Sequence, residues 1–479
     1  MKPSVLRRGL YGLLTLALLA SQACTTQPGE RLSSLAALKD EAPARRSLDI
    51  QQWRTPEGAR VLFVEARELP MFDLRLTFAA GSSQDRGVHG LALMTNAMLN
   101  EGIRGRDADA IAAGFESLGA QFGNGAYRDM AVASLRSLSD PQRREPALEL
   151  FSEVVGRPMF PSDALTRVRN QVLSSIEFNK KNPGKLASQA LFDALYGPHP
   201  YGHSSEGTAK SLNGIRQAQL RDFHRRAYTA GNAVIALVGD LSRSEAEAIA
   251  AQVSRALPAG RALAKTAEPV APAPVHRHVE FPSNQTHLQI AQLGIPRGHP
   301  DYAALFLGNQ VLGGGGFGSR LMEEVREKRG LTYGIYSGFS PMQTRGPFMI
   351  SMQTRADYTE GSLALIKDMV RQFLAEGPTG EELQQAKREL AGSFPLSTAS
   401  NAAIVGQLGA IGFYDLPLDH LERFVEEVQS LSAEQVRAAM NRHLDPEAFV
   451  VVTVGPTVAQ SELPPPNGQA QPQPTGVRH

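Results

Sequence analysis

Three features of the sequence predict an α+β fold built from two tandem, homologous halves. Each half begins with strand-like alternation, at residues 61–78 and 278–295, and each ends in a β-branched run, at 232–240 and 448–456. An amphipathic helical pattern precedes that last run in both halves. Strands and helices do not alternate regularly, so we expect in each half a largely antiparallel sheet with helices packed on one face.

A Pro/Ala-rich stretch, residues 257–275, separates the two halves, because such a stretch cannot easily join a helix or a sheet. The expected organisation is a first domain at 48–256, this linker, and a second domain at 276–457. A period of half the chain indicates a duplicated domain rather than a solenoid. Residues 458–479 are rich in Pro and Gln and have little apolar surface to bury, so we expect a disordered tail.

The N-terminus has the pattern of a secretory signal peptide at residues 1–23, followed by a linker at 24–47. Basic residues precede an apolar run at 9–20 that is too short to span a bilayer, although a buried helix is an alternative. Cys24 is the only cysteine, which rules out an intrachain disulfide. Its position resembles a bacterial lipobox, whose cysteine is lipidated; simple cleavage before it is the alternative. We expect a periplasmic protein with an outer-membrane lipid anchor.

The charge of the chain gives no sign of a nucleic-acid partner. Its 479 residues include 49 basic and 48 acidic side chains, and the net charge is +1. The chain has neither a strong excess of basic residues nor a block of them, so its charge does not indicate a nucleic-acid binding surface.

The segment that begins at Gly90, GLALMTNAML, predicts a short helix with no titratable side chain. Leu91, Met94 and Met98 recur at helical spacing, and Gly102 can end the segment. The helix follows a strand-like run, where an active-site helix would be expected to carry reactive groups. A core helix of an unrelated fold is the alternative interpretation.

Over most of residues 48–456 the chain resembles the pitrilysin, insulysin and mitochondrial processing peptidase superfamily, the inverted zincins. Members carry a Gly-Leu-Ala-His-x-x-Glu-His-Met-Leu helix in their first half, and the frame is kept here. The first ligand, catalytic Glu, second ligand and third ligand positions hold Leu93, Asn96, Ala97 and Ser175.

The residues at these four positions lack the groups that zinc binding and catalysis require. In HxxEH, two imidazoles four residues apart hold Zn²⁺, and the Glu takes a proton from the metal-bound water. Leu93 and Ala97 offer a metal no lone pair, and Asn96 has no carboxylate to accept the proton. Glu177, two residues beyond Ser175, should face elsewhere. The sequence therefore predicts a degenerate zinc site without metal or cofactor.

The second half keeps another part of the resembled family's site. In members of that family, an Arg at the end of a helix and a Tyr seven residues later reach the substrate. The matching residues in this chain are Arg326 and Tyr333. The resemblance implies that the Tyr hydroxyl donates to the oxyanion and that the Arg holds a substrate carbonyl. The alternative is that Arg326 complements a helix dipole and Tyr333 packs in the sheet.

A glycine run precedes that helix, and we expect Gly314, Gly315, Gly316 and Phe317 to contact the substrate. The run fits G-x-G-x-x-G, but residues 302–312 before it have helical rather than strand spacing, which argues against a dinucleotide site. Small residues there permit the close approach of a peptide.

His199 and His203 have the spacing of a metal-binding pair, but Pro and Gly between them prevent the helix that would align them. We therefore expect no metal there.

These observations predict a non-catalytic subunit that forms one clam-shell half of a secreted zinc metalloendopeptidase. The resemblance implies a heterodimer in which a homologous partner brings HxxEH and zinc, while this chain brings Arg326 and Tyr333. The substrates would be extended or unfolded peptides. Two alternatives are a homodimeric peptide-binding or scaffold pseudoenzyme and an active hydrolase with a relocated site.

Overall fold

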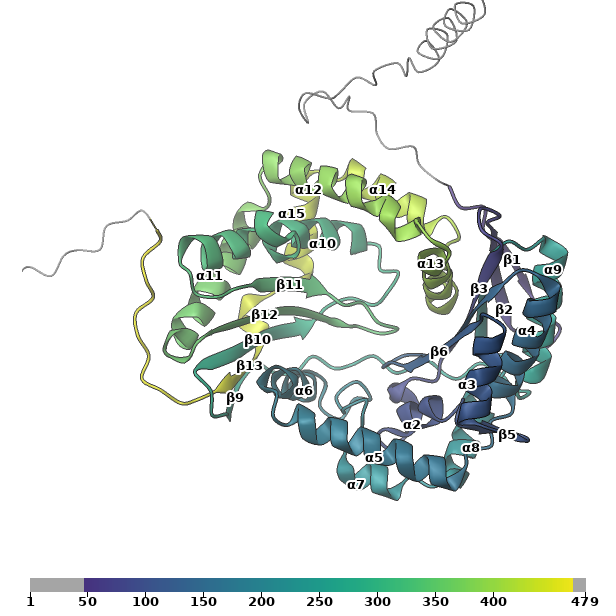
Figure 1. Ribbon diagram of the computed structural model, residues 1–479. Coiled ribbons are helices and arrows are strands. Elements are labelled where there is room, and N and C mark those ends of the chain that lie inside the picture. The colour runs from purple at the N-terminus through teal and green to yellow at the C-terminus, as the bar shows by residue number, and fades with distance from the viewer. Residues whose placement is uncertain (1–46, 468–479) are drawn as a thin grey trace, which may run out of the picture. The chain divides into compact units, whose positions relative to one another are not determined.

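The computed structural model describes residues 47–467 (Figure 1). The predicted signal peptide at 1–23, nearly all of the linker after it, and Cys24 lie outside these residues. No helix in the described part combines the length and hydropathy that a membrane crossing requires.

Six strands of the first half form one sheet in the order β1-β2-β8-β3-β7-β6. Their bounds are β1 Gln51–Arg54, β2 Arg60–Glu65, β3 Met71–Phe78, β6 Gln121–Ala126, β7 Ala131–Leu138 and β8 Ala233–Gly239. β2 and β8 pair in parallel, and the other neighbours pair antiparallel. A two-stranded ribbon, β4 Gly102–Ile103 and β5 Arg106–Asp107, lies outside this sheet.

The second half forms a five-stranded sheet in the order β11-β12-β10-β13-β9. Its strands are β9 Val275–Glu280, β10 Gln285–Leu293, β11 Ile335–Phe339, β12 Pro347–Arg355 and β13 Val450–Gly455. Only β9 and β13 pair in parallel. This order repeats β6-β7-β3-β8-β2 of the first half, so the two halves share one topology. The predicted α+β fold with two similar halves is confirmed.

Each half supplies helices that form its core with one face of its own sheet, some packed on the strands and others packed on those helices. In the first half these are α2 Leu91–Ala97, α3 Ala108–Ser117, α4 Pro141–Gly156, α5 Ser162–Asn179, α7 Ala209–Gly214, α8 Gln217–Ala227 and α9 Arg243–Ala256. In the second half they are α10 Tyr302–Asn309, α11 Thr359–Glu376, α12 Gly380–Ser393, α14 His420–Ser430 and α15 Ala433–His443. Alternation along β3 shows why, since Phe72, Leu74, Leu76 and Phe78 are all buried in the first core.

The second face of each sheet carries one helix from the other half (Figure 1). Helix α13, Asn401–Tyr414, belongs to the second half and packs on β2, β3 and β8 of the first. Helix α6, Pro183–Tyr196, belongs to the first half and packs on β10 and β13 of the second. Each half therefore contributes one helix to a hydrophobic core on the sheet of the other half. The sequence patterns did not predict this exchange.

The segments outside the two sheets are ordered by specific contacts. Residues 257–274 run without helix, and an isolated bridge joins Arg261 to Gly231. The prediction of a disordered tail is wrong for residues 458–467. These residues bond to the second half at several points, because their Pro, Gln and Asn groups find backbone partners there.

Candidate functional site

Helix α2 begins at a buried carboxylate that the sequence analysis missed. The Asp85 side chain is fully buried, and its two oxygens accept hydrogen bonds at 2.8 Å from the backbone N–H groups of Gly90 and Ala92. Gly90 has φ +89°, and a Cβ there would lie 2.8 Å from the Glu206 carbonyl oxygen, so glycine is required. A carboxylate at a helix N-terminus satisfies otherwise orphaned N–H groups. The available signal was an Asp five residues before the helix-starting glycine.

His203 also contacts Asp85, but not as half of a metal pair with His199. Its Nε2 donates to Asp85 Oδ2 at 3.2 Å, and its ring stacks on His89 with centroids 4.1 Å apart. Burial, and then the adjacent His203, lower the pKa of His89. His199 instead donates through Nε2 to the Ala267 carbonyl at 2.8 Å. The two histidines therefore have separate structural partners.

Of the three α2 positions that the sequence predicts to be degenerate, Asn96 is buried and Ala97 packs against the first core. Asn96 is 2% exposed and donates through Nδ2 to the Val132 carbonyl at 3.1 Å and to the Tyr228 hydroxyl at 3.2 Å. Leu93 and Ala97, on the same side of the helix, are half-buried. Burial raises the pKa of the enclosed Tyr228. The amide of Asn96 thus connects α2 to strand β7 and helix α8.

Ser175 lies on α5, which packs against α2, and its side chain is exposed. Glu177 is also exposed and forms an ion pair with Lys180 at 2.7 Å. Its carboxylate is therefore directed to the C-terminal end of α5, and the expectation that Glu177 faces away from the Ser175 side agrees with this pairing. Ser175 offers a hydroxyl where the resemblance leads us to expect the carboxylate of a third zinc ligand.

Arg326 and Tyr333 flank a turn that leads into strand β11. The helix predicted at this place forms, but residues Met322–Lys328 are π-helical, a wider winding than the α-helix expected from the sequence. The Arg326 guanidinium lies 4.5 Å from the centre of the Phe317 ring and 3.2 Å from Glu327. Gly330, at φ +63°, ends the helix as predicted. Tyr333 is 90% exposed.

The glycine run has two different parts. A Cβ on Gly314 or Gly315 would meet Asn309 Nδ2 at 2.4 Å or the Gln310 carbonyl at 2.6 Å, so these glycines permit close backbone packing. Gly316, at φ +61°, faces open space, and the Phe317 side chain is 70% exposed. The run follows helix α10 and a π-helical turn, Gln310–Gly314, rather than a strand. This arrangement argues against a dinucleotide site, as the sequence analysis expected.

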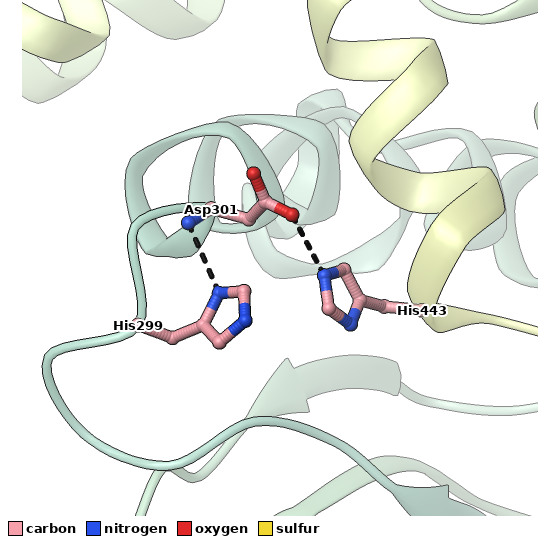
Figure 2. Close-up of side chains that lie close together, drawn as sticks. All are labelled: His299, Asp301 and His443. Atoms are coloured by element: carbon pink, nitrogen blue, oxygen red, sulfur yellow. Dashed lines mark hydrogen bonds and ion pairs between the residues drawn. The ribbon is translucent and has the colours of Figure 1, made fainter.

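Within residues 47–467, one group of three side chains has the spacing of a metal site: His299, Asp301 and His443 (Figure 2). Its hydrogen bonds oppose that role. The Asp301 N–H donates to His299 Nδ1 at 3.1 Å, and His443 Nε2 donates to the Asp301 carboxylate at 2.8 Å. Arg442 holds the same carboxylate with two further bonds, and its hydrogen bonds lower the pKa of Asp301. We infer that this cluster joins the start of α10 to the end of α15.

Comparisons with known proteins match both halves. Residues 60–209 match the family model described as "Insulinase (Peptidase family M16)", and residues 214–390 match "Peptidase M16 inactive domain". The chain is 26% identical to "Non-peptidase homolog YmxG" of Helicobacter pylori over 413 residues, covering 85% of this chain and 93% of the relative. It is 23% identical to "Uncharacterized zinc protease YmxG" of Bacillus subtilis, covering 85% of this chain and 98% of that protein.

Solved structures of similar fold agree with these sequence matches. A crystal structure described as a peptidase M16 inactive domain from Pseudomonas fluorescens superposes with a TM-score of 0.85 at 65% identity, covering 87% of this chain and 100% of that one. A protease from Helicobacter pylori superposes with a TM-score of 0.78 at 16% identity, covering 86% of this chain and 100% of that one, which supports the fold. The chain therefore belongs to peptidase family M16.

Proposed function

We propose that this chain is the non-catalytic subunit of a secreted zinc metalloendopeptidase heterodimer. It supplies Arg326 and Tyr333 to a homologous partner that bears HxxEH and alone holds the zinc. One observation carries the proposal: Tyr333 is 90% exposed, whereas Asn96, at the position of the catalytic Glu, is 2% exposed and bonded into the core. Asn96 is therefore part of the packed interior, whereas Tyr333 is presented to solvent.

The chemistry of the exposed groups suits an oxyanion and a peptide backbone. A Tyr hydroxyl donates a hydrogen bond to the oxyanion that forms when zinc-bound water attacks a peptide carbonyl. The Arg326 guanidinium has donors for a substrate carbonyl, and the Phe317 ring under it limits the directions in which it can point. Gly316 leaves open space beside them for the peptide.

The substrate class is extended or unfolded peptide, bound as an added strand. Strand β6 is an edge of its sheet, so one side of its backbone is unpaired within the described chain. It lies beside α2, where Asn124 Nδ2 donates to the Asn96 carbonyl at 2.6 Å. Gly123 and Gly125 place no side chain over this edge. Backbone hydrogen bonds to such an edge tolerate many sequences.

The relatives support a homologue without peptidase activity of its own, since one is named a non-peptidase homologue and one an inactive domain. Export to the periplasm, with Cys24 lipidated at the outer membrane, rests on the N-terminal sequence pattern alone.

The test mixes the chain with an HxxEH-bearing family member, which we expect the neighbouring reading frame to encode, and follows cleavage of a quenched peptide. Tyr333→Phe should slow cleavage by about 10²–10³-fold, because it removes one oxyanion donor. Tyr336→Phe is the matched control, since Tyr336 is 55% exposed on the adjacent strand. Equal rates for wild type and Tyr333→Phe would refute the assigned role. Cleavage by this chain alone, loaded with zinc, would refute the proposal.

A homodimeric peptide-binding scaffold is the second candidate, favoured by the edge strand β6, because adding a peptide strand to this edge would need no catalytic partner. Co-purification separates the two. A one-to-one complex with an HxxEH protein supports the heterodimer, and a stable self-dimer that binds peptide and recruits no protease supports the scaffold.

A further inference from the structure

The C-terminal segment after β13, residues 457–467, forms a strap along the second half. At its start, Thr457 bonds through its N–H and hydroxyl to the Glu280 carboxylate. Further on, Gln460 Nε2 donates to the Ala356 carbonyl at 3.0 Å, and the Ser461 N–H donates to the Asp357 carbonyl at 2.8 Å. The strap is therefore fixed at intervals rather than only at its origin.

Leu463 anchors the middle of the strap in the core of the second half. It is half-buried and packs against that core. A Cβ added to Gly361 would lie 2.7 Å from Leu463 Cγ, so the glycine on α11 makes the room that Leu463 fills. Three prolines follow, at 464–466, and stiffen the chain in an extended form.

The strap ends on the helix that carries Arg326. The Asn467 N–H donates to the Lys328 carbonyl at 2.7 Å, and Asn467 Nδ2 donates to the Glu327 carbonyl at 3.1 Å. Just past the helix, Arg329 Nη1 donates to the Pro464 carbonyl at 3.1 Å. The last carbonyls of a helix have no partner inside the helix, and Asn467 supplies two of the missing donors.

We infer that the strap positions the Arg326–Tyr333 segment, with Asn467 as its terminal clamp. A π-helix is rare, occurs mostly as a short segment and is frequent at functional sites. Tyr333 is exposed and has no hydrogen-bond partner among the described residues, so its place is set by the backbone on either side. Groups that bind a transition state must be held closely, and the strap fixes the helix end from which this turn starts.

Hydrogen exchange on the isolated chain tests the inference without a partner. The reporters are the Gly330 and Leu331 amides, which donate to Arg326 and Val325 at the helix end. A chain ending at Pro456 should exchange these amides at least about tenfold faster than wild type. Asn467→Ala removes one of the two clamp bonds and should give about a 2–10-fold increase.

Two controls isolate the strap. Glu462→Ala, at an exposed strap position, should leave exchange unchanged, and so should a chain that ends at Asn467. Circular dichroism should show wild-type secondary structure for every variant. Unchanged exchange at Gly330 and Leu331 in the chain ending at Pro456 would overturn the inference.

The catalytic consequence rests on the proposed function. In the complex with the HxxEH partner, Asn467→Ala should lower kcat more than it raises KM, because a misplaced donor weakens transition-state binding most. A wild-type complex without activity would count against the proposed function, while the exchange result would still decide the role of the strap. Faster exchange with an unchanged kcat would refute the positioning of Arg326 and Tyr333.

Discussion

Replacing Asn96 by alanine tests whether this residue, which the sequence predicts at the position of the catalytic Glu, stabilises the fold. The substitution removes two hydrogen bonds from a side chain that is 2% exposed. It leaves the Val132 carbonyl without this donor and the Tyr228 hydroxyl, which is fully buried, without its amide partner. Each such loss costs about 1–3 kcal/mol, and the small cavity adds to it, so we expect a total loss of about 2–4 kcal/mol in the free energy of unfolding.

Urea unfolding followed by Trp53 fluorescence and circular dichroism measures this loss, and agreement of the two probes checks that the transition is two-state. Asn100→Ala is the matched control, because Asn100 is half-buried and has no side-chain hydrogen bond in the described chain; it should change stability by less than about 0.5 kcal/mol. Combining Asn96→Ala with Tyr228→Phe should reveal a coupling of about 0.5–1.5 kcal/mol. If Asn96→Ala is as stable as Asn100→Ala, the position has no structural role.

Two further predictions concern stability. In helix α13, Gly412→Ala should destabilise the fold by about 1–3 kcal/mol, because its Cβ would lie 2.4 Å from Val234 and 2.8 Å from Leu62. Gly406→Ala on the same helix has open space and should stabilise by about 0.5–1 kcal/mol; equal effects would contradict the packing of α13 on the first sheet. Burial lowers the pKa of His224 to about 4. As the pH falls to 5, His224 becomes protonated in the unfolded chain but stays neutral in the folded chain. The free energy of unfolding should therefore fall by about 2 kcal/mol between pH 7.5 and 5. His224→Gln should remove this fall in urea titrations, and an unchanged slope would show that another group causes it.

Local patterns sufficed to predict the strands that begin and end each half and the helices next to them, because such patterns report on neighbouring residues. The alternation at 61–78 became β2 and β3, and the apolar spacing from Leu91 to Met98 became α2, which ends at Ala97, before the predicted end at Gly102. The same patterns could not predict that α6 and α13 exchange between the halves. An apolar stripe shows that a helix face is buried, but not which sheet buries it. That choice is made by long-range contacts.

At the candidate site, the sequence alone decides only which chemistry a residue type cannot supply. Leu93 and Ala97 cannot bind a metal in any conformation, so their identity was enough. The roles of Asp85 and Asn467 could not be predicted, because each depends on a backbone group that is brought to it by folding. The π-helical winding at 322–328 was missed for the same reason, since its sequence fits an α-helix equally well.

The difference in burial between the two sets of site residues is itself an argument for divided function. Packing explains Asn96, because its amide satisfies groups that would otherwise be unpaired in the core. Packing does not explain Tyr333 or Phe317, since both keep large apolar surfaces in water that burial would favour removing. Folding of this chain alone gives no reason to keep Tyr333 exposed or to hold Arg326 over the exposed ring of Phe317. A peptide, enclosed with the help of a second subunit, would cover them and use their donors.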